Sequence, residues 1–291
     1  MARTATTPNT LGQVGREAGQ AARDVVRSPW VEALARFGLA ARGVVYTIVG
    51  FLALKAAFGT GGDTTGAGGA IQTLAEKSRL LLALVAVGLF GYALWRIVQG
   101  ALDPENKGSD PKGLATRAAR IVSGAIYGGL AIAAMRLVAG SGASSGGGPG
   151  TDERTQHMTA GLMSQPFGRF LVAVAGLIVI GSGIHQITRG WKEKFRRNLR
   201  LQELQPAVQR RVIQAGKAGF IARGIVFVIM GIFFLQAARH ANPGEARGLG
   251  GALDTLAAQP YGPWLLGLVA LGLLMYGLYS FVEARYRQIV L

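Results

Sequence analysis

Two arginines lie inside long apolar stretches of this 291-residue sequence, where a charged side chain needs a physical reason. Arg42 stands near the start of an apolar block over residues 37–58, and Arg223 near the start of another over residues 220–238. Charged groups at membrane depth reach the headgroups or pair inside a bundle. Three interpretations remain open: each guanidinium extends to the headgroups, pairs with carbonyls or a carboxylate, or helps hold a lipid phosphate or other anion. Glu283, at the end of the last apolar block, is the candidate ion-pair partner.

Two further cations occupy equivalent places near the other ends of apolar blocks. Lys55 lies near the end of the first block, and Arg136 near the end of the block over residues 121–139. Extension of both side chains to the outer headgroups is one interpretation. The other is a ring of cations that attracts anions to an outer mouth, which Gln236 at the third equivalent position would weaken.

The residues that usually carry catalysis are absent or badly spaced. The chain has no cysteine, which excludes disulfides and thiolate chemistry, and its three histidines stand in no zinc-binding spacing. The glycine-rich run over residues 140–150 lacks the lysine of a phosphate-binding loop. We therefore expect no catalytic residues, no cofactor and no metal, and a protein that is not an enzyme.

Six apolar blocks position these residues, and each is close to the roughly 20 residues that span a bilayer. The blocks cover residues 37–58, 80–98, 121–139, 170–187, 220–238 and 264–282. Half of the chain is apolar and 16% is charged, below the roughly 25% typical of soluble proteins. The sequence predicts an all-α integral membrane protein with six transmembrane helices.

The first helix of each successive pair repeats the same pattern. Residues 38–50 (GLAARGVVYTIVG), 119–131 (ARIVSGAIYGGLA) and 219–231 (GFIARGIVFVIMG) align without gaps, which places Arg42, Ser123 and Arg223 in register. The second helices align through Trp95, His185 and Tyr279. Units of two helices keep one orientation, so these are parallel repeats, and we expect three of them around a pseudo-threefold axis in one bundle.

This organisation gives the expected boundaries of the chain. They are a basic N-terminal segment over residues 1–34, repeat 1 over 35–104, repeat 2 over 105–190, a basic amphipathic connection over 191–214 and repeat 3 over 215–291.

These repeated residues resemble a bacterial membrane family known as domain of unknown function 1206. The resemblance rests on AARGVVY at residues 40–46, on IARGIVF at residues 221–227 and on the GAxxTLA segments at residues 69–75 and 251–257. It covers nearly all of the chain beyond about residue 30 and implies three tandem two-helix units. The middle copy departs from the pattern with Ser123, and the family implies no activity.

Lysine and arginine are distributed unevenly between alternate connections. The two tails and the second and fourth connections hold 20 of them, against 6 in the first, third and fifth connections. The positive-inside rule then places both termini in the cytoplasm. The family resemblance implies that the membrane is a bacterial plasma membrane. The net charge of +16 is explained by this sidedness, so nucleic acid is not expected as a partner.

The connections themselves suggest different roles. Those over residues 59–69 and 140–150 have the composition of flexible linkers, whereas residues 191–211 are predicted to form a basic helix on the inner leaflet that binds anionic phospholipid. Pro206 is expected to break or kink this helix, and docking of a cytosolic partner is the alternative role. Residues 11–36 have a similar character.

The leading functional hypothesis is a non-enzymatic scaffold or lipid-interacting membrane protein, with a homo-oligomer or another membrane protein as a further partner. The rival is a small-solute or anion transporter or channel that uses the intramembrane arginines.

Overall fold

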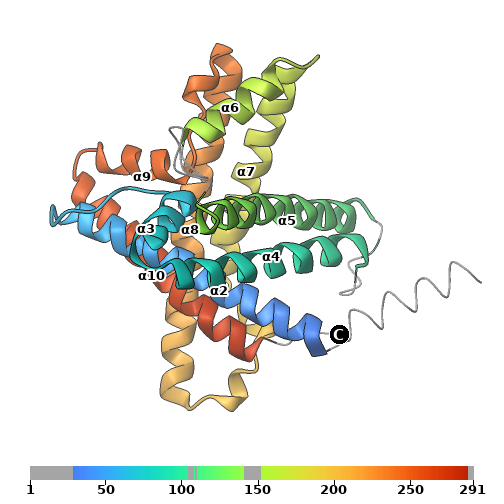
Figure 1. Cartoon of the computed structure of the whole chain (residues 1–291), viewed down its shortest axis with the longest axis vertical. Coiled ribbons are helices and arrows are strands. Elements are labelled where there is room, and N and C mark those ends of the chain that lie inside the picture. The colour runs from blue at the N-terminus through green and yellow to red at the C-terminus, as the bar shows by residue number, and fades with distance from the viewer. Residues whose placement is uncertain (1–28, 104–107, 109, 141–151, 288–291) are drawn as a thin grey trace, which may run out of the picture.

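The computed structural model describes residues 29–103, 108, 110–140 and 152–287, and within these ranges it is built from helices without a β-strand (Figure 1). Six helices are long and apolar enough to cross a membrane, as the sequence predicted. They are α2 (Pro29–Ala57), α4 (Arg79–Ala101), α5 (Pro111–Val138), α7 (Gly168–Trp191), α8 (Pro206–His240) and α10 (Gly262–Tyr286). At 1.5 Å per residue each exceeds the roughly 30 Å of a hydrocarbon core.

Each repeat also contains a short helix that the two-helix prediction missed. These are α3 (Ala67–Lys77), α6 (Asp152–Met163) and α9 (Leu249–Ala257), one before the second spanning helix of each repeat. The GAxxTLA segments form α3 and α9 because their apolar residues are spaced for one helical face, which buries Ile71 and Leu253. The expected linker over residues 59–69 is therefore helical from Ala67, and residues 141–151 of the other lie outside the described ranges.

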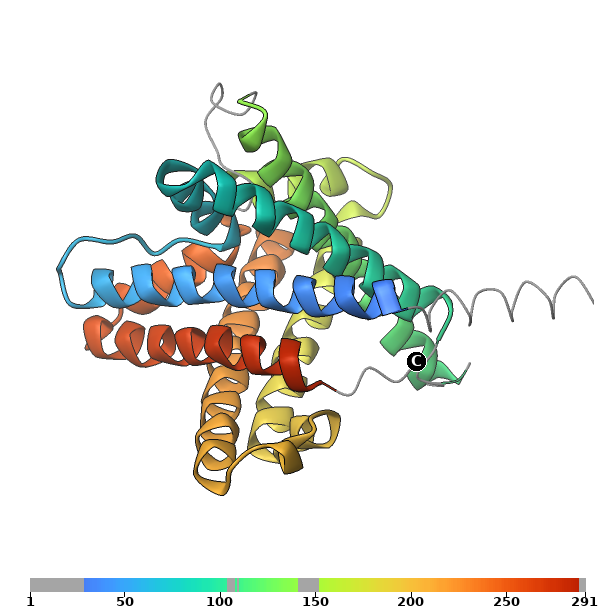
Figure 2. The same cartoon turned by 60° about the horizontal axis from the view of Figure 1, so that its bottom comes forward.

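The spanning helices pack as three antiparallel pairs, each formed between different repeats. Helix α4 packs on α5, α7 on α8, and α10 returns to pack on α2. Smaller interfaces join α2 to α4 and α8 to α10. In Figures 1 and 2 the α7–α8 pair runs at a steep angle to the α2–α10 pair. The three repeats thus form one bundle, with first and last spanning helices in contact.

The same small-residue contact occurs in all three pairs. A Cβ added at the equivalent glycines of α2, α5 and α8 would approach a backbone oxygen of the partner helix within 3.1 Å or less. The contacts are Gly43 with Gly277 (3.1 Å), Gly124 with Ala93 (2.9 Å) and Gly224 with Gly183 (2.7 Å). Such close backbone approach is how helices pack where lipid offers no hydrophobic drive. Equivalent residues therefore make the same contact in each of the three pairs.

The spanning helices contact one another in the order α5, α4, α2, α10, α8 and α7, which we call the ring of helices. The ring is open between α5 and α7, the two spanning helices of repeat 2. Repeats 1 and 3 join their own two helices by alanine–glycine contacts, Ala41 with Gly88 and Ala222 with Gly272. Repeat 2 has Val122 and Ile178 at these positions, and they are 58% and 60% exposed. Within the described ranges α5 and α7 share no interface comparable to the others. Two bulky residues therefore replace the pair that allows close approach.

Repeat-related arginines hold the helix ends together. Arg36 donates to the carbonyl oxygens of Ala284 and Arg285, and Arg117 donates in the same way to those of Gly100 and Ala101. We call this the basic end of the bundle; it also contains the α7–α8 connection, whose Arg200 amide donates to the Tyr286 carbonyl. The opposite end, which carries α3, α6 and α9, is the short-helix end. There Arg79 and Arg169 donate to the last carbonyls of α5 and α8.

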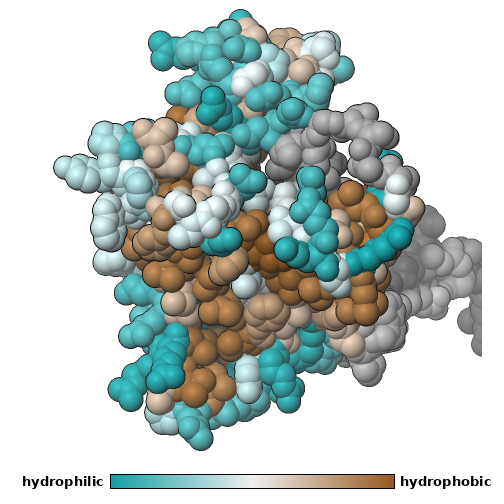
Figure 3. Space-filling view, turned by 60° about the vertical axis from the view of Figure 1, so that its left-hand side comes forward, coloured by the Kyte–Doolittle hydropathy of each residue, from teal (hydrophilic) through white to brown (hydrophobic). Residues whose placement is uncertain are grey.

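The outer surface is that of a membrane protein. Apolar side chains gather in a band across the face seen in Figure 3, with hydrophilic surface above and below it. Large aromatic residues are exposed near the helix ends, with Tyr261 and Trp264 at the short-helix end and Trp191 at the basic end. Aromatic residues at these depths are typical of the two membrane–water interfaces.

The basic connection does not form the amphipathic helix predicted over residues 191–211, and a new helix begins at Pro206, the residue expected to break it. It contains two 3-10 turns, η1 (Lys194–Asn198) and η2 (Leu201–Glu203), before α8 begins with Pro206 in its first turn. Phe195 is fully buried and stacks on Phe220 at 5.3 Å between ring centroids. The apolar residues of the connection thus pack inward. Most of the N-terminal segment, residues 1–28, lies outside the described ranges.

Candidate functional site

Arg42 is buried at the interface of α2, α4 and α10. One terminal nitrogen, Nη2, lies 2.6 Å from Glu283 Oε2, and the other donates to the Tyr92 hydroxyl at 2.8 Å. Nη2 also lies 3.3 Å from Ser280 Oγ. Arg42 is 3% exposed, so in this structure its charge is paired inside the bundle and does not extend to a headgroup.

Glu283 is shared by two arginines at the basic end. It is 3% exposed, and its second oxygen accepts from Arg287 at 2.9 Å. Tyr92 accepts a second hydrogen bond, from Arg96 at 2.9 Å. A carboxylate buried at this depth is stable only when paired in this way, because desolvation of an isolated charge costs several kcal/mol.

Arg223 also has a tyrosine partner, but it has no carboxylate like Glu283 beside it. Its Nη1 donates to the Tyr276 hydroxyl at 2.8 Å, and its guanidinium lies over the rings of Tyr46, Phe227 and Tyr276 at 5.2, 4.8 and 5.0 Å. Its Nε is buried without a hydrogen-bond partner. No ion pair of Arg223 with a carboxylate occurs in the part of the chain that the structure describes. Glu283 therefore pairs with one of the two intramembrane arginines.

The arginine–tyrosine pair is a property of the repeat. Tyr92 and Tyr276 stand three residues before Trp95 and Tyr279, so they are equivalent positions of the second helices, and each binds the arginine of its own repeat. In repeat 2 both partners change, since Ser123 replaces the arginine and Ser182 the tyrosine. Sequence reasoning missed these tyrosines, although extension of the Trp95–His185–Tyr279 alignment by one turn would have found them.

Aromatic rings fill the space around the two arginines. Tyr46 meets Tyr276 edge to face at 4.9 Å, and the equivalent residues Tyr127 and Tyr92 meet at 4.8 Å. All four tyrosines are buried. The region where the repeats converge is therefore packed by aromatic and guanidinium groups.

The other two candidate cations lie apart from this network, toward the short-helix end. Lys55 is partly buried in the last turn of α2, and Arg136 is exposed in the last turn of α5. Their placement near helix ends agrees with the interfacial interpretation as well as with the anion-attracting one.

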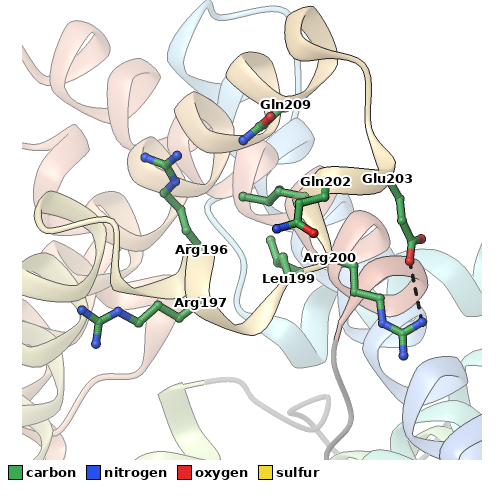
Figure 4. Close-up of a pocket in the computed structure, with 8 residues that line it drawn as sticks. Arg196, Arg197, Leu199, Arg200, Gln202, Glu203 and Gln209 are labelled. Carbon is green, nitrogen blue, oxygen red and sulfur yellow. Dashed lines mark ion pairs between the residues drawn. The ribbon is translucent and has the colours of Figure 1, made fainter.

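A second candidate site is an open pocket of about 530 Å³ at the basic end (Figure 4). It is lined by the α7–α8 connection and the start of α8, with the exposed arginines Arg196, Arg197 and Arg200. Glu193 and Glu203 each pair with one of these arginines, Arg196 at 2.9 Å and Arg200 at 3.7 Å. Beside the connection Lys217 lies over the exposed ring of Trp191 at 5.0 Å. Exposed guanidinium groups around a pocket are suited to phosphate oxygens.

These features define a multi-pass membrane protein assembled from three tandem repeats, with a buried arginine–tyrosine network between them. The chain belongs to the family described as Domain of Unknown Function (DUF1206), whose model matches residues 37–103, 118–193 and 218–287, one match per repeat. It is similar to the uncharacterized protein YxxB of Bacillus subtilis (strain 168), with 34% identity over 262 residues that cover 89% of this chain and 92% of the relative. No solved structure matches it.

Proposed function

We propose that this protein is a non-enzymatic, lipid-interacting protein of the bacterial plasma membrane, which binds anionic phospholipid at its basic end. The observation that carries the proposal is the cluster of exposed arginines around the pocket of the α7–α8 connection. The distribution of lysine and arginine supports an orientation with this end and both termini in the cytoplasm. The inner leaflet carries anionic lipid, and each basic residue near it contributes about 1 kcal/mol of attraction.

The position of the pocket relative to the membrane supports the same proposal. Trp191, 69% exposed, ends the spanning helix immediately before the connection, at the depth expected of an interfacial aromatic residue. The arginines that follow then lie at headgroup level. Packing of the bundle centre by Tyr46, Tyr92 and Tyr276 favours binding over conduction through the middle of the ring.

The test is retention of lipid by the purified protein in native mass spectrometry, with phosphatidylglycerol and phosphatidylethanolamine supplied in equal amounts. The wild type should retain phosphatidylglycerol preferentially. Combined Arg196→Gln, Arg197→Gln and Arg200→Gln should weaken that preference by at least about tenfold, since three interfacial charges are removed.

The matched control removes three exposed cations of the short-helix end, by Lys77→Gln, Arg239→Gln and Arg247→Gln. It makes the same change in net charge and should keep the preference. Equal retention of both lipids by the wild type, or an equal loss in both triple variants, would rule out a lipid site at the basic end.

A further inference from the structure

Arg223 is a partly buried cation whose charge is only partly compensated. Its contacts are one tyrosine hydroxyl and three aromatic faces, and its buried Nε has no hydrogen-bond partner. A cation–π contact is worth about 0.5–2 kcal/mol, whereas a single charge at membrane depth costs about 3 kcal/mol or more. The aromatic cage thus offsets part of the cost and supplies no negative charge.

The repeats show what is missing. Glu283 of α10, the helix that precedes α2 around the ring, neutralises Arg42. Ser280, one turn earlier on α10, accepts a hydrogen bond from the same arginine. The helix that packs on Arg223 in the same relation is α7, where the equivalent residues are Arg189 and Gln186. A cation therefore stands where the other interface has its carboxylate.

The two replacing residues are suited to bind an anion from outside the chain. Gln186 is 9% exposed, and its Oε1 is buried without a hydrogen-bond partner. Rotation of this amide presents its NH2 group as a donor instead. Arg189 is held over the Phe220 ring at 4.7 Å from the centroid. Two guanidinium groups and an amide are ligands that phosphate or carboxylate oxygens prefer.

The opening of the ring gives such an anion a route from the bilayer. The opening lies between α5 and α7, where Val122 and Ile178 are exposed. Ser123, the next residue of α5, and Ser182, one turn beyond Ile178 on α7, are partly buried. The apolar sides of the opening suit an acyl chain, whereas a free ion would have to cross hydrocarbon to use it.

We propose that Arg223, Gln186 and Arg189 bind the anionic headgroup of an amphiphile that enters between α5 and α7. Its phosphate or carboxylate takes the place that Glu283 has at the equivalent interface. This site is distinct from the exposed pocket of the α7–α8 connection.

The test measures ligand-induced thermal stabilisation of the full chain in neutral detergent. It uses the background with Arg196→Gln, Arg197→Gln and Arg200→Gln, so that the outcome does not depend on the exposed pocket. Dioctanoyl-phosphatidylglycerol, dioctanoyl-phosphatidylcholine and inorganic phosphate are titrated separately. Phosphatidylglycerol should stabilise the protein saturably, and phosphatidylcholine should not. Inorganic phosphate is expected to have no effect; if it stabilises equally, and Arg223→Gln removes the effect, the site takes a free anion.

Two variants and a control identify the site. Arg223→Gln should weaken binding by at least about tenfold, because it removes a charged donor. Arg189→Glu recreates the carboxylate of the equivalent interface, so it should raise the stability of the unliganded protein and abolish the response to ligand. Arg210→Gln, on the exposed side of α8, should bind as the background does. An unchanged response in either Arg223→Gln or a folded Arg189→Glu would overturn the proposal.

Discussion

Arg42 and Glu283 form an ion pair at 2.6 Å across 241 residues of sequence, and this pair joins the first spanning helix to the last. Both side chains are almost completely buried. The contact lies between α2 and α10, so it closes the arrangement of repeats at the basic end. Arg36, which donates to the carbonyls that end α10, reinforces the same junction.

Loss of one partner of this pair should destabilise the protein strongly. Glu283→Gln leaves Arg42 with an uncompensated buried charge, and removal of one member of a buried pair costs about 3–5 kcal/mol. Unfolding in detergent by denaturant is the measurement. Glu203→Gln, which breaks the exposed contact with Arg200, is the control and should cost about 0–1 kcal/mol.

The double variant Arg42→Met with Glu283→Met separates charge from packing. Because neither charge then remains, it should be more stable than Glu283→Gln alone. If the double variant loses as much stability as Arg42→Met and Glu283→Met lose together when made singly, the two residues act independently.

Two glycines of α7 provide a matched pair for helix packing. A Cβ at Gly183 would lie 2.7 Å from the Gly224 carbonyl oxygen, whereas one at Gly181 would meet nothing within 4 Å. Gly183→Ala should therefore destabilise by about 1–3 kcal/mol through overpacking, and Gly181→Ala should be neutral or stabilise by up to about 1 kcal/mol. Melting temperatures measured side by side decide this, and equal shifts would contradict the close approach of α7 and α8.

Sidedness can be measured directly because the chain contains no cysteine. Asp63→Cys places a thiol in the exposed α2–α3 connection, and Gln202→Cys places one in the exposed α7–α8 connection. With the basic end in the cytoplasm, a membrane-impermeant maleimide should label the first in intact cells and the second only after permeabilisation. The reverse pattern would show that the positive-inside interpretation is wrong for this protein.

Several features could be predicted from the sequence because they are periodic or repeated. Six apolar blocks of membrane-spanning length specified the spanning helices, and the alignment of residues 38–50 with its two copies specified their order. Glu283 was identified as a candidate partner because it stands at the end of the last apolar block. Helix bounds were less accurate, since α2 and α8 continue into polar sequence where hydropathy gives no signal.

The remaining features depend on contacts between residues far apart in the chain. Tyr92 and Tyr276 read as ordinary apolar-helix residues until the structure shows each beside its arginine. The opening of the ring involves Val122 and Ile178 together, and neither residue by itself indicates that α5 and α7 are apart. Phe195 lies in a basic segment, so its burial against Phe220 was hidden by the surrounding charge.

The closure of the ring between α2 and α10, and its opening between α5 and α7, are tested most directly by engineered disulfides. Ala57 Cβ lies 3.7 Å from the Cβ position of Gly267, within the range of about 3.5–4.5 Å that a disulfide requires. The same distance separates Ala93 from Gly128 across α4 and α5.

The decisive measurement is disulfide formation within one chain, read as the mass of alkylated free thiols after mild oxidation in membranes. Ala57→Cys with Gly267→Cys, and Ala93→Cys with Gly128→Cys, should each form an intramolecular disulfide in nearly all molecules. Val122→Cys with Ile178→Cys should keep both thiols free. Free thiols in the Ala57–Gly267 pair, or a ready disulfide between residues 122 and 178, would contradict the arrangement.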